Sequence, residues 1–155
     1  MRYKSTRTPD KLYSFMDALY SGLAPDGGLF LPESIPHLLE EPEEFYDLSL
    51  TEMAQHFLAP FITEIGEREL DRIIERTFNF DIGIRTLDRH VSVVELYHGP
   101  TLAFKDFGAR FLANVMSYYL HEEHRKCKIL VATSGDTGSA VANAFLGMDC
   151  ADVVL

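Results

Sequence analysis

Lys105 stands in a setting that is unusual for a lysine, because apolar side chains surround it. Phe104 and Phe107 flank it, and Asp106 follows it directly. Withdrawal from water disfavours the charged ammonium, and a neutral amine is the form that condenses with a carbonyl group. The pattern therefore permits a nucleophilic lysine. The alternative, which residue types alone favour, is a lysine lying along the surface beside Asp106, with that aspartate as a helix N-cap.

A second segment whose residue types could bind a ligand combines hydroxyls, glycines and a carboxylate at the expected start of a helix. It consists of Ser134, Gly135, Asp136, Thr137 and Gly138. Free N–H groups at a helix start suit an anion such as a carboxylate, but Asp136 would repel a phosphate dianion. The segment also lacks the Gly-Lys-Ser/Thr ending of a P-loop. We therefore expect a zwitterionic amino acid or a ring-bearing ligand, with a simple N-cap by Ser134 or Asp136 as the alternative.

The other histidine and arginine candidates carry weaker signals. His98 has the chemistry of an acid or base, but its place beside Gly-Pro is more typical of a turn residue. Arg110 is expected to form an ion pair on a helix surface, with anion binding as the alternative. His121 and His124 lie in a Glu-rich helix end and are expected at the surface, because their neighbours do not suit a closed metal site.

Cys127 and Cys150 flank two expected strands and have no metal-ligand spacing. They are interpreted as small buried hydrophobes, with a disulfide as the less favoured alternative. No function is assigned to either thiol.

The elements that position these residues change in character near residue 88. Before it, apolar spacing predicts a short extended start at Tyr3, helices over 13–23, 50–62 and 67–78, and a strand over 29–32, with Pro60 ending or kinking the second helix. After it, strands over 91–96, 128–133 and 151–155 alternate with helices over 106–121 and 138–146. Continuous apolar strands in this alternation predict a parallel sheet covered on both faces.

Composition limits the class of protein. The chain has 155 residues, 46% of them apolar, and can bury one core of ordinary size. Its formal charge of -10 disfavours nucleic acid or an anionic membrane face as a partner. No apolar run approaches the roughly 20 residues that cross a bilayer, and no signal core follows the N-terminus, so a cytoplasmic location is expected.

Three segments in order resemble threonine synthases. Residues 98–108 are similar to the segment that carries the cofactor lysine, 132–140 to the next strand-to-helix loop, and 3–7 with 22–32 to the family's opening. The family commonly has glycine after its Ser-Thr-Arg, whereas Thr8 stands here, which puts a tight backbone role at that position in doubt. The resemblance covers essentially the whole chain.

The resemblance implies an α/β protein of the fold type II kind that uses pyridoxal 5'-phosphate (PLP). Residues 1–88 would form an N-terminal, mostly helical region, and 89–155 the first part of an incomplete PLP-binding domain with an open, mainly parallel sheet. Lys105 would hold the cofactor as an imine and act as the catalytic residue, and Phe104 and Asp136 would contact the cofactor. The segment from Ser134 to Gly138 would face the substrate carboxylate.

The implied reaction converts O-phospho-L-homoserine and water to L-threonine and phosphate. The alternatives are a related phospho-lyase, which does not add water, and a non-catalytic binding module. The chain ends within an expected strand, so it is interpreted as truncated. In the family, the loop for the PLP phosphate and the partner of the pyridine nitrogen lie beyond the position of Leu155. We therefore expect these 155 residues alone to be inactive, to bind PLP weakly or not at all, and to self-associate through an open sheet edge.

Overall fold

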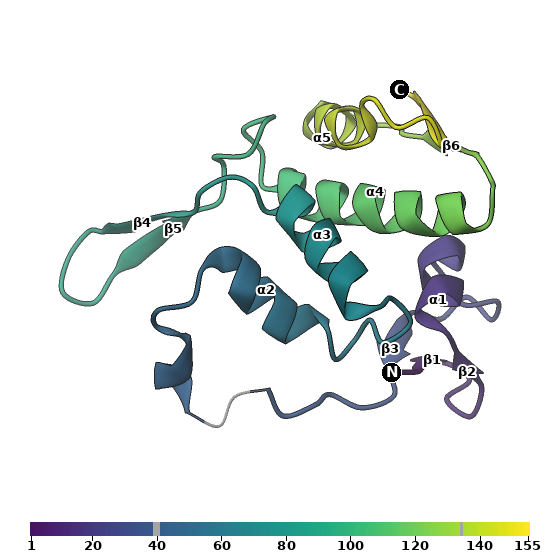
Figure 1. Cartoon of the computed structure of the whole chain (residues 1–155), viewed down its shortest axis with the longest axis horizontal. Helices are drawn as coiled ribbons and strands as arrows, with labels where there is room; N and C mark the ends of the chain where they lie inside the picture. The colour runs from purple at the N-terminus through teal and green to yellow at the C-terminus, as the bar shows by residue number, and fades with distance from the viewer. Residues whose placement is uncertain (39–40, 134) are drawn as a thin grey trace. The chain divides into compact units, whose positions relative to one another are not determined.

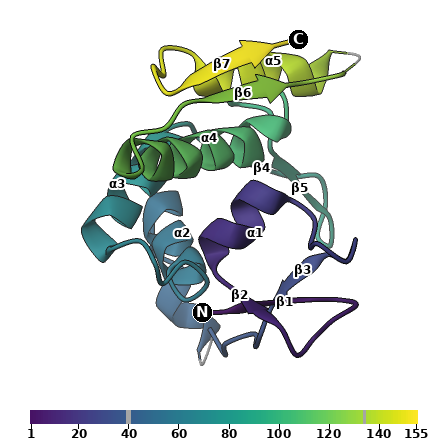
Figure 2. The ribbon, with the colours of Figure 1, turned by 90° about the vertical axis from the view of Figure 1, so that its right-hand side faces the viewer.

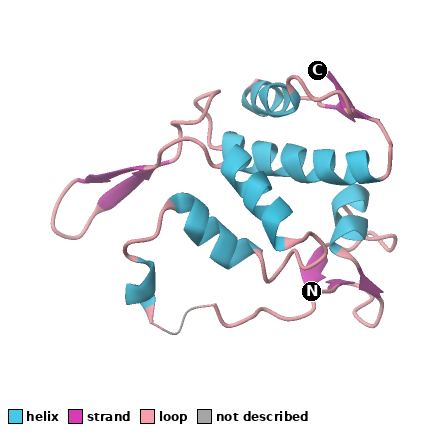
Figure 3. Cartoon of the chain, in the orientation of Figure 1, coloured by secondary structure: helices cyan, strands magenta, loops and turns pink. Residues whose placement is uncertain are grey.

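The structure is a computed structural model that describes residues 1–38, 41–133 and 135–155 (Figure 1). The chain divides into two compact units, Met1–Ile74 and Glu75–Leu155. Both units contain helices and short strands (Figure 3). The boundary between residues 88 and 89, expected for the two functional domains, stays a prediction.

The first unit contains a three-stranded antiparallel sheet in the order β2-β1-β3. Strand β1 is Tyr3–Ser5, β2 is Leu12–Tyr13 and β3 is Phe30–Pro32, with Tyr3 opposite both Tyr13 and Pro32. The sequence predicted β1 and β3, but β2 was missed because two residues are too short for an alternating pattern.

Three α-helices follow the apolar spacing of the sequence: α1 (Phe15–Ser21), α2 (Leu50–Leu58) and α3 (Glu67–Thr77). A 3₁₀ helix, η1, spans Pro42–Phe45. Ser14 with Asp17 and Ser49 with Glu52 form capping boxes at the starts of α1 and α2, satisfying backbone N–H groups that have no partner inside the helix. Helix α2 ends before Pro60, as predicted.

The core of the first unit gathers side chains from its sheet and helices. Glu64 accepts hydrogen bonds from the backbone N–H groups of Phe15 at 2.8 Å and Met16 at 3.2 Å, so its carboxylate lies at the start of α1. The Tyr3 hydroxyl donates to the Phe61 carbonyl at 2.8 Å. The buried apolar residues of this unit are Tyr3, Ala24, Ile62, Ile65, Leu70, Ile73 and Ile74.

The second unit begins with the end of α3 and an antiparallel hairpin of β4 (Gly83–Thr86) and β5 (Ser92–Glu95). The sequence predicted a strand here but wrongly placed it in the parallel sheet. Its apolar run suggested burial on both faces, whereas Val91, Val93 and Val94 are all exposed. In the described part of the chain β5 pairs with β4 alone.

The rest of the second unit is a strand-helix-strand arrangement. Helix α4 (Lys105–Glu122) leads to β6 (Cys127–Leu130), then α5 (Asp136–Phe145) and β7 (Ala151–Val154). Strands β6 and β7 are parallel, so the start of a parallel sheet is confirmed, and the chain is a mixed α/β structure. Helix α5 packs against both α4 and β7 (Figure 2). The core between them is centred on Ala113, Ala144 and Phe145.

Arg110 fixes α4 against the end of α3. Its guanidinium donates to the carbonyls of Thr77 at 2.9 Å and Arg76 at 2.5 Å, and to Asn79 Oδ1 at 2.6 Å. The ion pair expected for Arg110 is therefore replaced by hydrogen bonds to backbone carbonyls at a helix C-terminus. The guanidinium carbon of Arg110 lies 5.7 Å from the centroid of the Phe80 ring. No helix among the described residues is long and apolar enough to span a membrane.

Candidate functional site

The start of α4 places Lys105 directly after a turn that Asp106 holds. The Asp106 carboxylate is fully buried and accepts two hydrogen bonds from Thr101, from its N–H at 2.9 Å and its hydroxyl at 2.7 Å. Leu102 has φ of 57°, and its N–H donates to the Gly99 carbonyl at 3.0 Å. A Cβ on Gly99 would lie 2.5 Å from Asp106 Oδ2. Position 99 therefore requires glycine, because the Asp106 carboxylate approaches its Cα too closely for a side chain.

This geometry corrects the expected role of Asp106. It is not the N-cap of α4, because the cap position is Phe104, which forms no side-chain cap. The carboxylate instead fixes the turn that leads into Lys105. The lysine side chain itself is exposed, and Phe104 is 66% exposed. The exposure of Lys105 agrees with the alternative that residue types alone favour, a lysine lying along the surface, and not with an ammonium withdrawn from water.

A pocket of about 290 Å³ joins the lysine to the second predicted segment. The pocket is lined by Phe104, which precedes α4, by Lys105, Gly108, Ala109 and Leu112 of α4, and by Thr137 and Val141 of α5. The α4 residues recur at three- and four-residue spacing and so share one helix face, and the two α5 residues are four apart. The pocket is thus a mainly apolar slot lined by residues of α4 and α5, with Lys105 among them.

The start of α5 supplies the other side of this pocket. Gly135 occupies the N-cap position with φ of 151°, and no side chain among the described residues caps the helix. The N-cap expected from Asp136 is therefore wrong: Asp136 is the first residue of the helix and is exposed. Ser134 lies outside the described residues. Gly138 is buried, and a Cβ there would lie 2.6 Å from the Thr133 methyl group.

The predicted site residues are thus partly brought together. Lys105, Phe104 and Thr137 line one pocket. Gly135, Asp136 and Gly138 adjoin it in sequence without lining it. Sequence reasoning missed the small and apolar residues of the two helix faces. Their signal was the helical spacing from Lys105, which continues to Gly108, Ala109 and Leu112.

A second pocket, of about 510 Å³, lies beside the hairpin. Its residues are Phe80, Asp81, Ile82, Gly83, Glu95 and His98. His98 Nε2 lies 3.0 Å from Glu95 Oε2, and the hydrogen bond from His98 is the main reason that the pKa of Glu95 is below its usual range. His98 therefore does more than occupy a turn, because it pairs with a carboxylate on β5.

Comparison with known proteins gives a consistent result. A family profile described as "Threonine synthase N terminus" matches residues 2–78. The threonine synthases of Haemophilus influenzae and Escherichia coli are 39% and 36% identical to the chain; each match covers 100% of this chain and 36% of the relative. Threonine synthase-like 2 of Mus musculus is 35% identical over 100% of this chain and 34% of the relative.

Solved structures agree with the sequence relatives. The PLP-bound threonine synthase from Brucella melitensis superposes with a TM-score of 0.93 at 39% identity, covering 99% of this chain and 34% of that chain. The threonine synthase from yeast gives 0.89 at 31% identity, over 98% and 34%. The chain spans about a third of the length of the relatives that it matches.

Proposed function

The chain belongs to the threonine synthase family, whose N-terminal portion it matches, and we propose that it provides Lys105 to a PLP-dependent synthesis of L-threonine. The substrates would be O-phospho-L-homoserine and water, and the second product phosphate. Because the chain spans about a third of its relatives' length, the proposal concerns the natural protein with any residues that follow Leu155. A cytosolic location stays a prediction from the sequence.

The observation that carries the proposal is the shared pocket of Lys105 and Thr137. Its chemistry fits PLP: Lys105, which lines the pocket, carries a primary amine, and Ala109, Leu112 and Val141 offer apolar contact to a flat ring. The uncapped start of α5 adds N–H groups that suit an anionic group of the cofactor or the substrate. Lys105 would bind the cofactor covalently, and Phe104 and Asp136 would contact it.

The residues of this chain would then have separate roles in the reaction. The loop 134–138 would donate N–H and hydroxyl hydrogen bonds to the substrate α-carboxylate and so orient the amino acid. PLP, when bound, would supply an electron sink beside the substrate Cα. The free amine of Lys105 would take protons from Cα and Cβ as phosphate leaves Cγ, and it would return protons to Cγ, which becomes the methyl group, and to Cα after water adds at Cβ.

Borohydride reduction of the natural protein after addition of PLP tests the lysine. Peptide mass mapping is expected to place the reduced adduct on Lys105, and Lys105→Ala to remove it. The variant should also lose threonine formation by at least about 10²- to 10⁴-fold, the usual contribution of a positioned acid and base. Lys126→Ala, an exposed lysine after α4, is the matched control and should keep both adduct and activity. An adduct that persists in Lys105→Ala would refute the assignment.

A phospho-lyase is the second candidate, since the similarity to threonine synthase-like 2 is of nearly the same strength as that to the synthases. It would use the same amine but add no water at Cβ. Product analysis with O-phospho-L-homoserine separates the two, because the lyase would release a 2-oxo acid and ammonia instead of threonine. A non-catalytic module would bind PLP or an amino acid and yield neither product. We expect no turnover from the 155 residues alone.

A further inference from the structure

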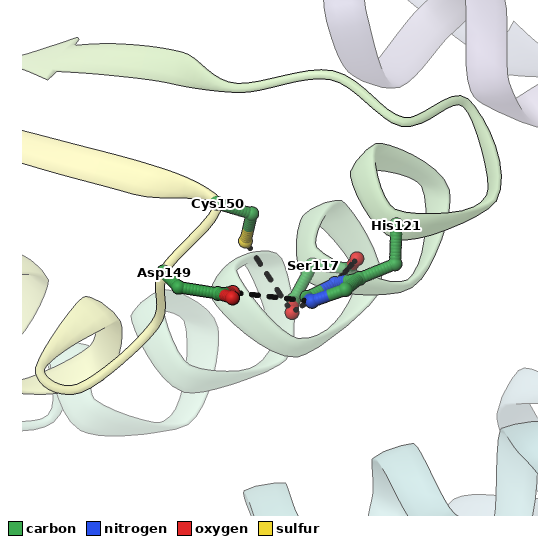
Figure 4. A network of polar contacts seen from close by, with 4 residues as sticks. All are labelled: Ser117, His121, Asp149 and Cys150. Carbon is green, nitrogen blue, oxygen red and sulfur yellow. Dashed lines mark hydrogen bonds and ion pairs between the residues drawn. The ribbon is translucent and has the colours of Figure 1, made fainter.

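Three side chains of different metal-binding chemistry meet at the far end of α4 (Figure 4). His121 comes from the last turn of the helix, and Asp149 and Cys150 come from the segment that leads into β7. One nitrogen, one oxygen and the sulfur all lie within 4.8 Å of one another. Sequence spacing does not predict this group, because 27 residues lie between His121 and Asp149 and only the fold brings them together.

The orientation of His121 is fixed by a hydrogen bond to the backbone of its own helix. Nδ1 lies 2.7 Å from the Ser117 carbonyl oxygen, and since a carbonyl oxygen can only accept, Nδ1 carries the proton. In the neutral ring this leaves the lone pair on Nε2. That nitrogen points at Asp149 Oδ1, 3.2 Å away (Figure 4). The same arrangement, with one ring N–H held by a carbonyl, is usual for metal-bound histidines.

A neutral imidazole nitrogen and a carboxylate oxygen repel each other when their lone pairs face. A metal ion bound by both atoms would replace this repulsion with attraction. Cys150 adds a third donor at the same place: the residue is 3% exposed, and its thiol donates a long hydrogen bond, 3.5 Å, to Ser117 Oγ. Because this hydrogen bond is weak, the thiol loses little energy when it exchanges the bond to Ser117 for a bond to a metal ion.

We propose that His121, Asp149 and Cys150 form a binding site for Zn²⁺, with a water molecule as the fourth ligand. Imidazole, carboxylate and thiolate are the donors that Zn²⁺ accepts, whereas Mg²⁺ and Ca²⁺ prefer oxygen alone. Bonds of about 2.0 to 2.3 Å in a tetrahedron place the donor atoms about 3.3 to 3.7 Å apart. The contraction from 4.8 Å is small, and the Asp149 side chain, which is 83% exposed, can turn toward His121 and Cys150.

The site would act as a clamp between α4 and the start of β7. It is separate from the lysine pocket, because 16 residues of helix from Lys105 to His121 span about 24 Å. Bound Zn²⁺ would stabilise the folded protein in proportion to its affinity, and it would release the thiol proton on binding. The proposal of this site therefore does not rest on the proposed reaction at Lys105.

Zinc titration of the natural protein, freed of metal with a chelator, tests the site. Equilibrium dialysis is expected to give one Zn²⁺ per chain, with a raised melting temperature. His121→Asn, Asp149→Asn and Cys150→Ser should each weaken binding at least tenfold. Co²⁺ as a probe should give a thiolate charge-transfer band that Cys150→Ser removes. His124→Asn is the matched control: this exposed histidine of the same helix end, with φ of 52°, lies outside the group, and asparagine tolerates that backbone.

Two results would overturn the proposal. One is the absence of one-to-one binding of Zn²⁺ by the metal-free protein. The other is binding that His121→Asn leaves within twofold of the unchanged protein or that His124→Asn removes. If Cys150→Ser unfolds the chain because that side chain is buried, the two exposed variants and the Co²⁺ spectrum of the unchanged protein decide the question.

Discussion

Gly99 and Asp106 show how a single contact shapes the approach to Lys105. Because a Cβ on Gly99 would meet the fully buried Asp106 carboxylate at 2.5 Å, we expect Gly99→Ala to destabilise the protein by about 1 to 3 kcal/mol. Gly108→Ala is the matched control: a Cβ there meets nothing within 4 Å, and the change should stabilise α4 by about 0.5 to 1 kcal/mol. Denaturant unfolding measures both. Equal effects of the two variants would show that the close approach carries no energy.

Asp26 is the residue for which the structure makes the clearest pH prediction. Hydrogen bonds from the hydroxyls of Thr8 and Ser5 and from the Gly28 N–H lower the pKa of its carboxyl to about 2. Thr8, which stands where the family commonly has glycine, thus has a partner of its own. Since the pKa is lower in the folded state than the usual value of about 3.9, the stabilisation is complete above pH 4 and is lost as the pH falls towards 2.

The matching measurement compares unfolding midpoints between pH 5 and pH 2. The unchanged protein should lose more stability over this interval than Asp26→Asn, which has no carboxylate to protonate. Asp10→Asn removes the same charge at a position where the described structure shows no such hydrogen bonds, and it should keep the slope of the unchanged protein. The prediction fails if Asp26→Asn and Asp10→Asn have the same slope.

At the scale of elements, Arg110 decides how α4 meets the end of α3. Lysine keeps the charge but not the planar fork that reaches the Thr77 and Arg76 carbonyls together with Asn79. We expect Arg110→Lys to cost about 1 to 3 kcal/mol, because backbone acceptors at the helix end lose their donors. Arg125→Lys, at an exposed arginine paired with Glu123, is the control and should change stability by less than about 1 kcal/mol. Thermal unfolding of the two variants tests the difference.

The elements also show what the sequence can and cannot predict. The helices were predicted well because their apolar spacing is local, and α2 ends before Pro60 for a reason confined to one residue. The hairpin was not predicted, since a strand that is exposed on both faces can have the same residue types as a strand that is buried on both faces. At the candidate site, the motif predicted Lys105 and Thr137, which line one pocket, but the walls at Ala109 and Val141 depend on how α4 and α5 face each other.

At the scale of the whole molecule, the net charge and the exposed apolar surface have opposite effects on association between copies of the chain. In the described residues β6 and β7 each have one strand neighbour, so the two-stranded sheet has free edges. Leu130 on β6 is 76% exposed, and Val154 on β7 is 52% exposed. Edges of this kind pair with another copy of the chain, whereas a formal charge of -10 on every copy repels it. The balance between the two terms should depend on salt.

We therefore predict that the 155-residue chain self-associates more strongly as salt is added. The range of the repulsion falls from about 30 Å at 0.01 M to about 8 Å at 0.15 M ionic strength, whereas pairing of strand edges is short-ranged. Sedimentation velocity should show a rising average sedimentation coefficient over this interval. Leu130→Lys should suppress the rise, because a charge on an edge strand opposes pairing. Leu146→Lys makes the same change at a leucine that is 79% exposed but lies outside the sheet, so it corrects for net charge. If both variants suppress association equally, charge alone governs it and the sheet edge does not.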